Sequence, residues 1–133
     1  MKIEFTVSGK KYVVSCGNVT GTAVDKWGGI RNRFVVTACI DDGKPVRFSF
    51  YDSIANYPKQ LDEAGLRRAF ECYVSDASCV AWCDGLDDFM RELSYKDRSE
   101  ARRAYEACSR AYGFFKEAGV DLYELQVWLE ENE

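Results

Sequence analysis

Apolar and polar residues alternate along much of the first half of the chain, with the period of two expected of a β-strand that has one buried face. The alternation predicts strands over residues 3–7, 12–16, 34–40 and 46–51, with a short further candidate at 20–24. Two tight connections favour hairpins: residues 8–10, and residues 41–44 with their Asp-Gly pair. The first half therefore predicts an antiparallel sheet of three or four strands.

The second half has a helical period. Between residues 61 and 83 the apolar residues form one stripe of a helix: Leu66, Ala69, Phe70, Tyr73, Val74, Ala77 and Ala81. Asp62 is placed to cap the start of this helix, and Gly85 follows its expected end. Further helices are predicted over residues 87–93, 99–118 and 121–130.

The expected fold class is α+β, with three or four helices packed on one face of the N-terminal sheet. The length predicts a single domain over residues 1–133, with a strand-rich half at 1–59 and a helical half at 60–133. Phe70 and Tyr105 lie in the middle of the two long apolar stripes, so we expect both to be buried and close together.

Charge is distributed unevenly about the net value of -4. Residues 1–59 hold nine Lys and Arg against five Asp and Glu, and residues 60–133 hold nine against seventeen. This asymmetry indicates different partners for two surfaces, or simply two differently solvated surfaces. The chain has no long apolar run and its N-terminus lacks the apolar centre of a signal peptide, which predicts a cytoplasmic protein with no membrane partner.

The chain has six cysteines and no histidine. Cys72, Cys79 and Cys83 fall within about 40° of one another around one predicted helix, and Cys108 is the only candidate for a fourth metal ligand nearby. Zinc sites usually draw closely spaced cysteine pairs from turns, and this chain has no CxxC. We therefore interpret the thiols as reduced, mostly buried, apolar side chains, and expect neither a metal nor a cofactor.

Enzymatic activity is not expected. A serine or cysteine nucleophile usually needs a neighbouring base, most often histidine. The adjacent carboxylates of Asp87 and Asp88 point about 100° apart on a helix and do not share a proton. No small-molecule substrate is evident.

A predicted loop, VDKWGGIRNRF at residues 24–34, combines an aromatic side chain with cations. Trp27 is suited to stack on a base, while Lys26, Arg31 and Arg33 are suited to contact phosphates. The alternative is a surface loop whose tryptophan folds back onto the sheet.

Acidic residues gather in two places of the helical half. One set belongs to the short predicted helix and the residues before it: Asp84, Asp87, Asp88 and Glu92. The other set lies near the C-terminus and includes Asp121 and Glu124. Carboxylates at such spacing imitate a run of phosphates, as in a DNA mimic, and dock on a basic nucleic-acid channel. The alternative is a solvated face.

Four stretches, one at the end of the strand-rich half and three in the helical half, carry a family resemblance. They are F-x-F-Y-x-S-I-A-x-Y at residues 48–57, Ser-Asp-Ala at 75–77, D-F-x-x-E-L-x-Y at 88–95, and A-x-x-x-Y-x-A-C at 101–108. The segment resembles small accessory proteins carried by phages and integrative elements of gut Firmicutes and Actinobacteria. Members with known activity are anti-CRISPR or related counter-defence factors. The resemblance implies binding to host machinery in the bacterial cytoplasm, and it supplies no catalytic residues.

The leading hypothesis from the sequence is a non-catalytic inhibitor from a mobile genetic element. Its expected partner is a host protein or ribonucleoprotein defence complex, whose basic surface the acidic helical half would occlude sterically or by phosphate mimicry. The alternative is a nucleic-acid-binding accessory module that uses the basic strand-rich half and the loop around Trp27.

Overall fold

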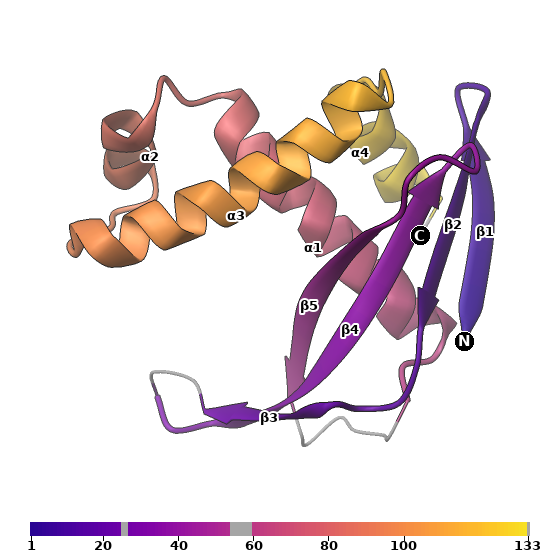
Figure 1. Cartoon of the computed structure of the whole chain (residues 1–133), viewed down its shortest axis with the longest axis horizontal. Coiled ribbons are helices and arrows are strands. Elements are labelled where there is room, and N and C mark those ends of the chain that lie inside the picture. The colour runs from indigo at the N-terminus through magenta and orange to yellow at the C-terminus, as the bar shows by residue number, and fades with distance from the viewer. Residues whose placement is uncertain (25–26, 54–59, 133) are drawn as a thin grey trace. The chain divides into compact units, whose positions relative to one another are not determined.

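The computed structural model describes residues 1–24, 27–53 and 60–132. Within them an antiparallel sheet of five strands precedes four helices, which confirms the α+β class (Figure 1). The strands are β1 (Lys2–Val7), β2 (Lys10–Cys16), β3 (Gly21–Val24), β4 (Ile30–Ile40) and β5 (Val46–Ser53). The helices are α1 (Glu63–Ala81), α2 (Leu86–Glu92), α3 (Arg98–Glu117) and α4 (Leu122–Glu131).

The chain forms two compact units, and their boundary lies within α1. Unit 1, Met1–Phe70, holds the sheet and the first turns of α1. Unit 2, Glu71–Glu133, holds the rest of α1 and the three later helices. No helix in the described part of the chain is both long and apolar enough to pass through a membrane.

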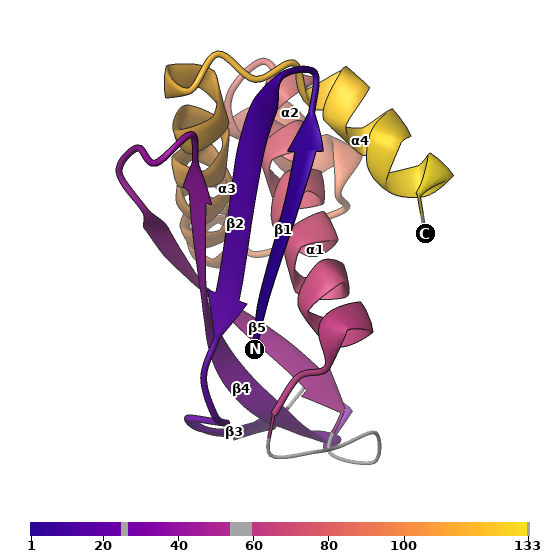
Figure 2. The same ribbon diagram turned by 90° about the vertical axis from the view of Figure 1, so that its right-hand side faces the viewer.

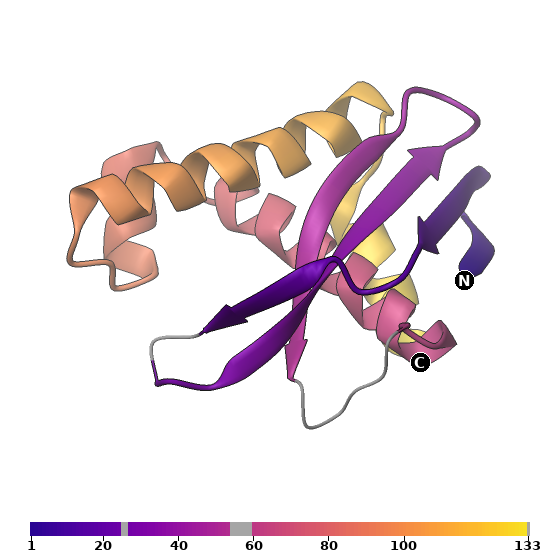
Figure 3. The same ribbon diagram turned by 60° about the horizontal axis from the view of Figure 1, so that its bottom comes forward.

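Strand β4 is the centre of the sheet and pairs with three other strands. Strand β5 runs along one edge of β4, from Arg31 to Ala38. Two strands share the other edge of β4: β2 pairs with the C-terminal part of β4, and β3 pairs with the N-terminal part of β4. Strand β1 then pairs with the far edge of β2. Figure 3 shows β3 and the start of β4 as a hairpin that continues past the end of β2.

The alternation along β4 separates two faces of the sheet. Even-numbered residues from Asn32 to Ile40 are buried, and the odd-numbered residues between them are only half-buried. Directly paired residues on neighbouring strands point to the same face. We call the buried side the inward face and the opposite side the outward face.

The first turns of α1 pack on the inward face of the sheet (Figure 2). The ring of Phe70 on α1 contacts Phe5 on β1 at 5.4 Å and Tyr12 on β2 at 5.8 Å, and the last two rings stack on each other at 5.2 Å. Arg68 on α1 also pairs with Asp52 on β5 at 3.2 Å. These contacts attach one helix to strands at both sides of the sheet.

The start of α1 is set by its cap. The helix begins after Asp62, whose carboxylate accepts a hydrogen bond from the backbone N–H of Gly65 at 2.7 Å, which confirms the predicted N-cap. Asp97 and Asp121 cap α3 and α4 in the same way. Side-chain oxygens thus satisfy backbone donors that a helix leaves without internal partners.

Unit 2 is held by contacts among its helices. Tyr73 on α1 lies against Phe114 and Phe115 of α3, with ring centroids 6.2 and 5.7 Å apart. Phe89 on α2 is fully buried, and its ring meets Tyr105 of α3 edge-on at 5.2 Å. Leu125 and Leu129 bury the apolar side of α4. These positions follow the helical periods in the sequence.

Three expectations from the sequence are wrong in detail. Residues 30–33 belong to β4 and not to a loop, so Arg31 and Arg33 are strand residues. Tyr105 is half-buried, since its ring covers Phe89 at the side of the helical cluster. Of the six cysteines only Cys16 is buried, while Cys72 is exposed and the other four are half-buried. The expected proximity of Phe70 and Tyr105, which belong to different units, stays a prediction.

We expect Phe70→Ala to lower the free energy of unfolding by about 3–5 kcal/mol, because the change removes a fully buried ring and leaves a cavity between α1 and two strands. Urea unfolding followed by circular dichroism measures the loss. Phe70→Leu keeps most of the apolar volume and should cost less. A loss under about 1 kcal/mol for the alanine variant would show that this ring does not hold the helix to the sheet.

Candidate functional site

Three arginines share the outward face of the sheet. Arg31 and Arg33 are odd-numbered residues of β4, and Arg47 on β5 is paired with Thr37 of β4 and so lies on the same side. With a rise of about 3.3 Å per residue, these positions span about 20 Å along the sheet. Strand pairing therefore turns three residues that are scattered in the sequence into one row, which we call the arginine row.

Tyr51 lies within the arginine row. It pairs with Arg33 across β4 and β5, so its side chain is on the outward face, where the residue is 43% exposed. The guanidinium Nε of Arg33 donates a hydrogen bond to Ser49 Oγ at 3.2 Å, which holds the arginine along the face. On the other edge of β4, Arg33 is paired with Gly21 and Arg31 with Ala23. These small residues add no bulky side chain beside the two arginines on the β3 side.

The outward face carries more positive than negative charge. In the described strands, Lys2 and Glu4 of β1 and Lys11 of β2 share this face with the arginine row. Glu4 forms an ion pair with Lys2 at 3.2 Å. Asp52, the acidic residue within β5, points inward and pairs with Arg68. The outward face therefore presents a positive surface to solvent.

Exposed apolar side chains lie at the end of the β3–β4 hairpin, where the alternation of β4 puts Val24 and Ile30 on the inward side. Val24 and Ile30 form the last pair of that hairpin, and Trp27 between them is 80% exposed. With most of the residue exposed, Trp27 is not buried against the sheet. Lys26, the fourth residue of the predicted basic loop, lies outside the described residues. Trp27 thus lies in the connection before β4, whereas Arg31 and Arg33 lie on β4 and not in the predicted loop.

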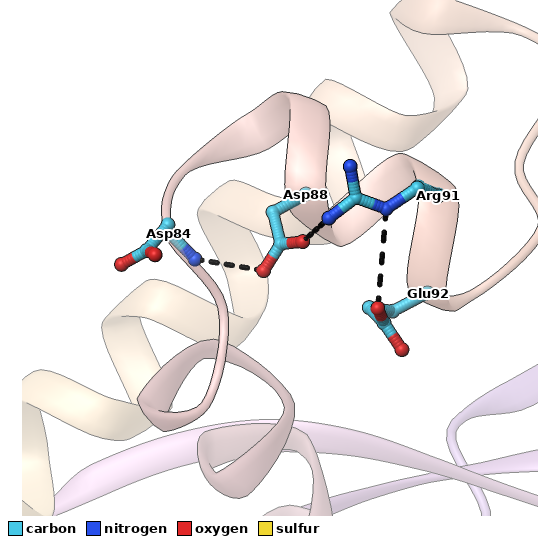
Figure 4. Close-up of polar contacts among 4 residues, drawn as sticks. All are labelled: Asp84, Asp88, Arg91 and Glu92. Carbon is cyan, nitrogen blue, oxygen red and sulfur yellow. Dashed lines mark hydrogen bonds and ion pairs between the residues drawn. The ribbon is translucent and has the colours of Figure 1, made fainter.

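The acidic residues around α2 have partners within the same unit. Arg91 forms ion pairs with Asp88 and, at 4.0 Å, with Glu92 (Figure 4). Asp88 also accepts a hydrogen bond from the backbone N–H of Asp84 at 3.0 Å, which fixes the turn before α2. Asp87 is paired with Arg98 of α3 at 2.8 Å. The arginines offset much of the charge that a phosphate mimic would present.

Asp121 and Glu124 belong to the start of α4. Asp121 is the N-cap, and its carboxylate accepts the backbone N–H of Glu124 at 3.1 Å. A negative charge at this end of a helix also stabilises the helix dipole. Asp88 and Asp121 therefore have structural roles. The prediction from the sequence treated both as binding residues and did not assign these roles.

Thiols from two helices come together in unit 2. Helices α1 and α3 run in opposite directions, and the contact of Tyr73 with Phe114 sets their register (Figure 1). Six residues further along α1 is Cys79, and six residues back along α3 is Cys108. Burial, and then the negative charges of Asp76, Cys79 and Cys83, raise the pKa of Cys108 to about 12. Both effects hold this thiol in its protonated form.

Cys72 differs from these thiols in its burial. It is exposed, whereas Cys79, Cys83 and Cys108 are half-buried. Burial also raises the pKa of Cys79. Thiols that stay protonated are poor nucleophiles and poor metal ligands. In the described residues, no group of three or more Cys, Asp or Glu side chains is arranged to hold a metal ion.

Sequence reasoning missed Tyr51 and Arg47 as candidate site residues. These two residues can be found from the hairpin between β4 and β5. Once Ala38 pairs with Val46, strand register decides which residues of β5 lie on the same face as Arg33. Comparison with protein-family models, with curated proteins and with solved structures finds no match to this chain. The roles of these residues are therefore argued from geometry and charge.

We expect stability to fall as the pH rises from about 9 toward 12, because the unfolded chain ionises Cys108 near its ordinary pKa while the native state keeps it protonated. This contribution is fully present below the ordinary pKa and is lost as pH approaches the native value. Urea unfolding with a reductant at about pH 7.5 and about pH 10.5 measures the fall.

Cys108→Ala is the control for the pH dependence. It should lose less stability between the two pH values than the native chain, although Tyr73, whose pKa burial raises to about 12, still contributes to the fall. An equal fall in both proteins would show that Cys108 ionises normally in the folded state.

Proposed function

We propose that this chain is a non-catalytic module that binds nucleic acid through the outward face of its sheet. The observation that carries the proposal is the arginine row: strand register puts Arg47, which is exposed, and Arg31 and Arg33, which are half-buried, on one face beside Tyr51. Guanidinium groups bind phosphates through paired, charge-assisted hydrogen bonds. A row of them about 20 Å long is suited to contact several phosphates of one strand.

The charge pattern supports this proposal over phosphate mimicry. The carboxylates of Asp87, Asp88 and Glu92 are within ion-pair distance of arginines in unit 2. On the outward face, cations outnumber carboxylates in the described strands. A phosphate backbone approaching this face releases counterions and gains affinity from every cation that it meets.

The proposal is tested with the triple variant Arg31→Ala, Arg33→Ala, Arg47→Ala. We expect binding of a labelled oligonucleotide to weaken by about tenfold or more at about 0.1 M salt, and the salt dependence to become shallower by about 0.7 per lost phosphate contact on a single strand. Fluorescence anisotropy measures both quantities. Surface substitutions move stability by about 0.5 kcal/mol, so the fold should be kept.

A matched triple variant controls for the loss of charge alone. Lys96, Arg102 and Arg103 are exposed cations of unit 2, and their replacement by alanine removes the same charge without changing a residue of the sheet. This control should bind as the native chain does. Equal weakening in the two triple variants, or no binding by the native chain at low salt, would reject the outward face as the binding surface.

A second candidate function is inhibition of a host defence complex by occlusion of a basic surface. The observation that favours it is the exposure of Asp84, Asp87 and Glu92 around one short helix, within a half of the chain that carries eight more acidic than basic residues. The resemblance to counter-defence proteins of mobile elements points the same way. Complementary charge would steer such a complex and make it sensitive to salt.

Charge reversal distinguishes this second candidate. Asp84→Lys, Asp87→Lys and Glu92→Lys together should weaken capture of a host ribonucleoprotein from lysate by about tenfold or more, while Asp88 and Asp121 stay unchanged because they support the fold. Reversal of Glu100, Glu106 and Glu117, which are exposed on α3, is the matched control. Undiminished capture by the first variant would exclude the acidic set around α2.

A further inference from the structure

Two exposed aromatic side chains accompany the arginine row. Tyr51 is opposite Arg33 in the sheet, and Trp27 lies at the end of the hairpin that carries Arg31. The pair formed by Val24 and Ile30 is three residues along β4 from the pair that includes Tyr51, which is about 10 Å. The two rings are therefore separate platforms. Tyr51 is directly opposite Arg33, and Trp27 comes four residues before Arg31 in the chain.

Aromatic platforms next to cations suit one form of nucleic acid. In a duplex the faces of the bases are stacked on each other, so a duplex would meet the arginine row through its phosphates alone. In a single strand the base faces are accessible, and stacking on an aromatic side chain contributes about 1–3 kcal/mol per base. The exposure of Trp27 at 80% is costly for an apolar side chain in water, and a stacked base would cover it.

The flanking residues allow a base to lie flat at this place. On the β3 side of the arginine row, the residues paired with Arg33 and Arg31 are Gly21 and Ala23. Ser49, the neighbour of Tyr51 on the same face of β5, is also small and hydrogen-bonds Arg33. The small side chain of Ser49 leaves room beside the ring of Tyr51 along β5, and Gly21 and Ala23 add no bulky side chain beside Arg33 and Arg31.

We propose that the ligand of the outward face is a single-stranded nucleic acid that runs along β4, with bases stacked on Tyr51 and Trp27 and phosphates on Arg31, Arg33 and Arg47. This inference rests on the proposed function and adds the strandedness of the ligand and a role for each ring. The chemistry of an unpaired base and a phosphate is shared by DNA and RNA, so both are used as probes.

The test compares three dye-labelled probes in fluorescence anisotropy: oligo-dT and oligo-U of about 20 nucleotides, and a DNA duplex of about 20 base pairs. We expect at least one single strand to bind about tenfold or more tightly than the duplex. Tyr51→Ala and Trp27→Ala should each weaken single-strand binding by about fivefold or more and leave the weaker duplex binding unchanged. Tyr51→Phe and Trp27→Phe keep an aromatic face and should retain most of the affinity.

Two exposed aromatic residues of unit 2 are matched controls. Trp82 is 75% exposed and Tyr123 is 67% exposed, and each has carboxylates as near neighbours in the chain, Asp84 and Glu124 respectively. Trp82→Ala and Tyr123→Ala remove the same kinds of ring from surroundings that repel phosphates. They should leave binding of every probe unchanged.

The outcomes separate this inference from the function on which it rests. The single-strand inference is overturned if the duplex binds as tightly as the single strands or more tightly. It is also overturned if neither Tyr51→Ala nor Trp27→Ala reduces single-strand affinity. In both cases the proposed function stands as long as binding depends on the arginine row. Equal losses in the control variants also overturn the inference. If the native chain binds none of the three probes, the inference and the proposed function fail together.

Discussion

Pairing along both edges of β4 is the constraint on which unit 1 depends. Because side chains alternate along a strand, the register of β4 decides at once which residues join the core and which form the opposite surface. Phe34, Val36 and Ala38 are buried by the same alternation that places Arg33 on the outward face. A slip of one residue would exchange the two sets, so the core and the arginine row are specified together. Burial of the apolar set therefore maintains the geometry of the cationic set.

The two halves of the chain use their charges differently. Around α2 the carboxylates have arginine partners or cap a turn, as Asp88 does for Asp84. Surface ion pairs of this kind add little to stability, but they reduce the field that a partner would meet. On the sheet, extended backbone and strand pairing hold several cations on one face, where their potentials add. The residue count suggested an acidic binding half, whereas the ion pairs around α2 and the cations gathered on the sheet support our proposal of the smaller positive surface.

Much of the fold follows from local patterns that the sequence displays directly. The alternation at β1, β2 and β5, the Asp-Gly hairpin before β5, and the Asp62 cap of α1 were predictable because each depends on neighbouring residues. The N-terminal part of β4 was missed for a physical reason. Its inward position 32 is a buried asparagine, and Arg31 and Arg33 flank it, so the apolar alternation that marks a strand is absent there. The pairing with β3 and β5 compensates for the weak local pattern.

The sequence alone determined the fold class, the periodicity of each long helix and the presence of a tryptophan near several cations. Tertiary structure decided which cations share a face, because Arg31 and Arg47 are distant in the chain and come to one side of the sheet only through the pairing of β4 with β5. It also decided that Tyr51 belongs to the candidate site, and that Asp88 and Asp121 support turns and helix ends. Local periodicity reports which side of its own element a residue occupies. Which residues of other elements share that side depends on strand register and helix packing, and these are set by contacts between segments far apart in the sequence.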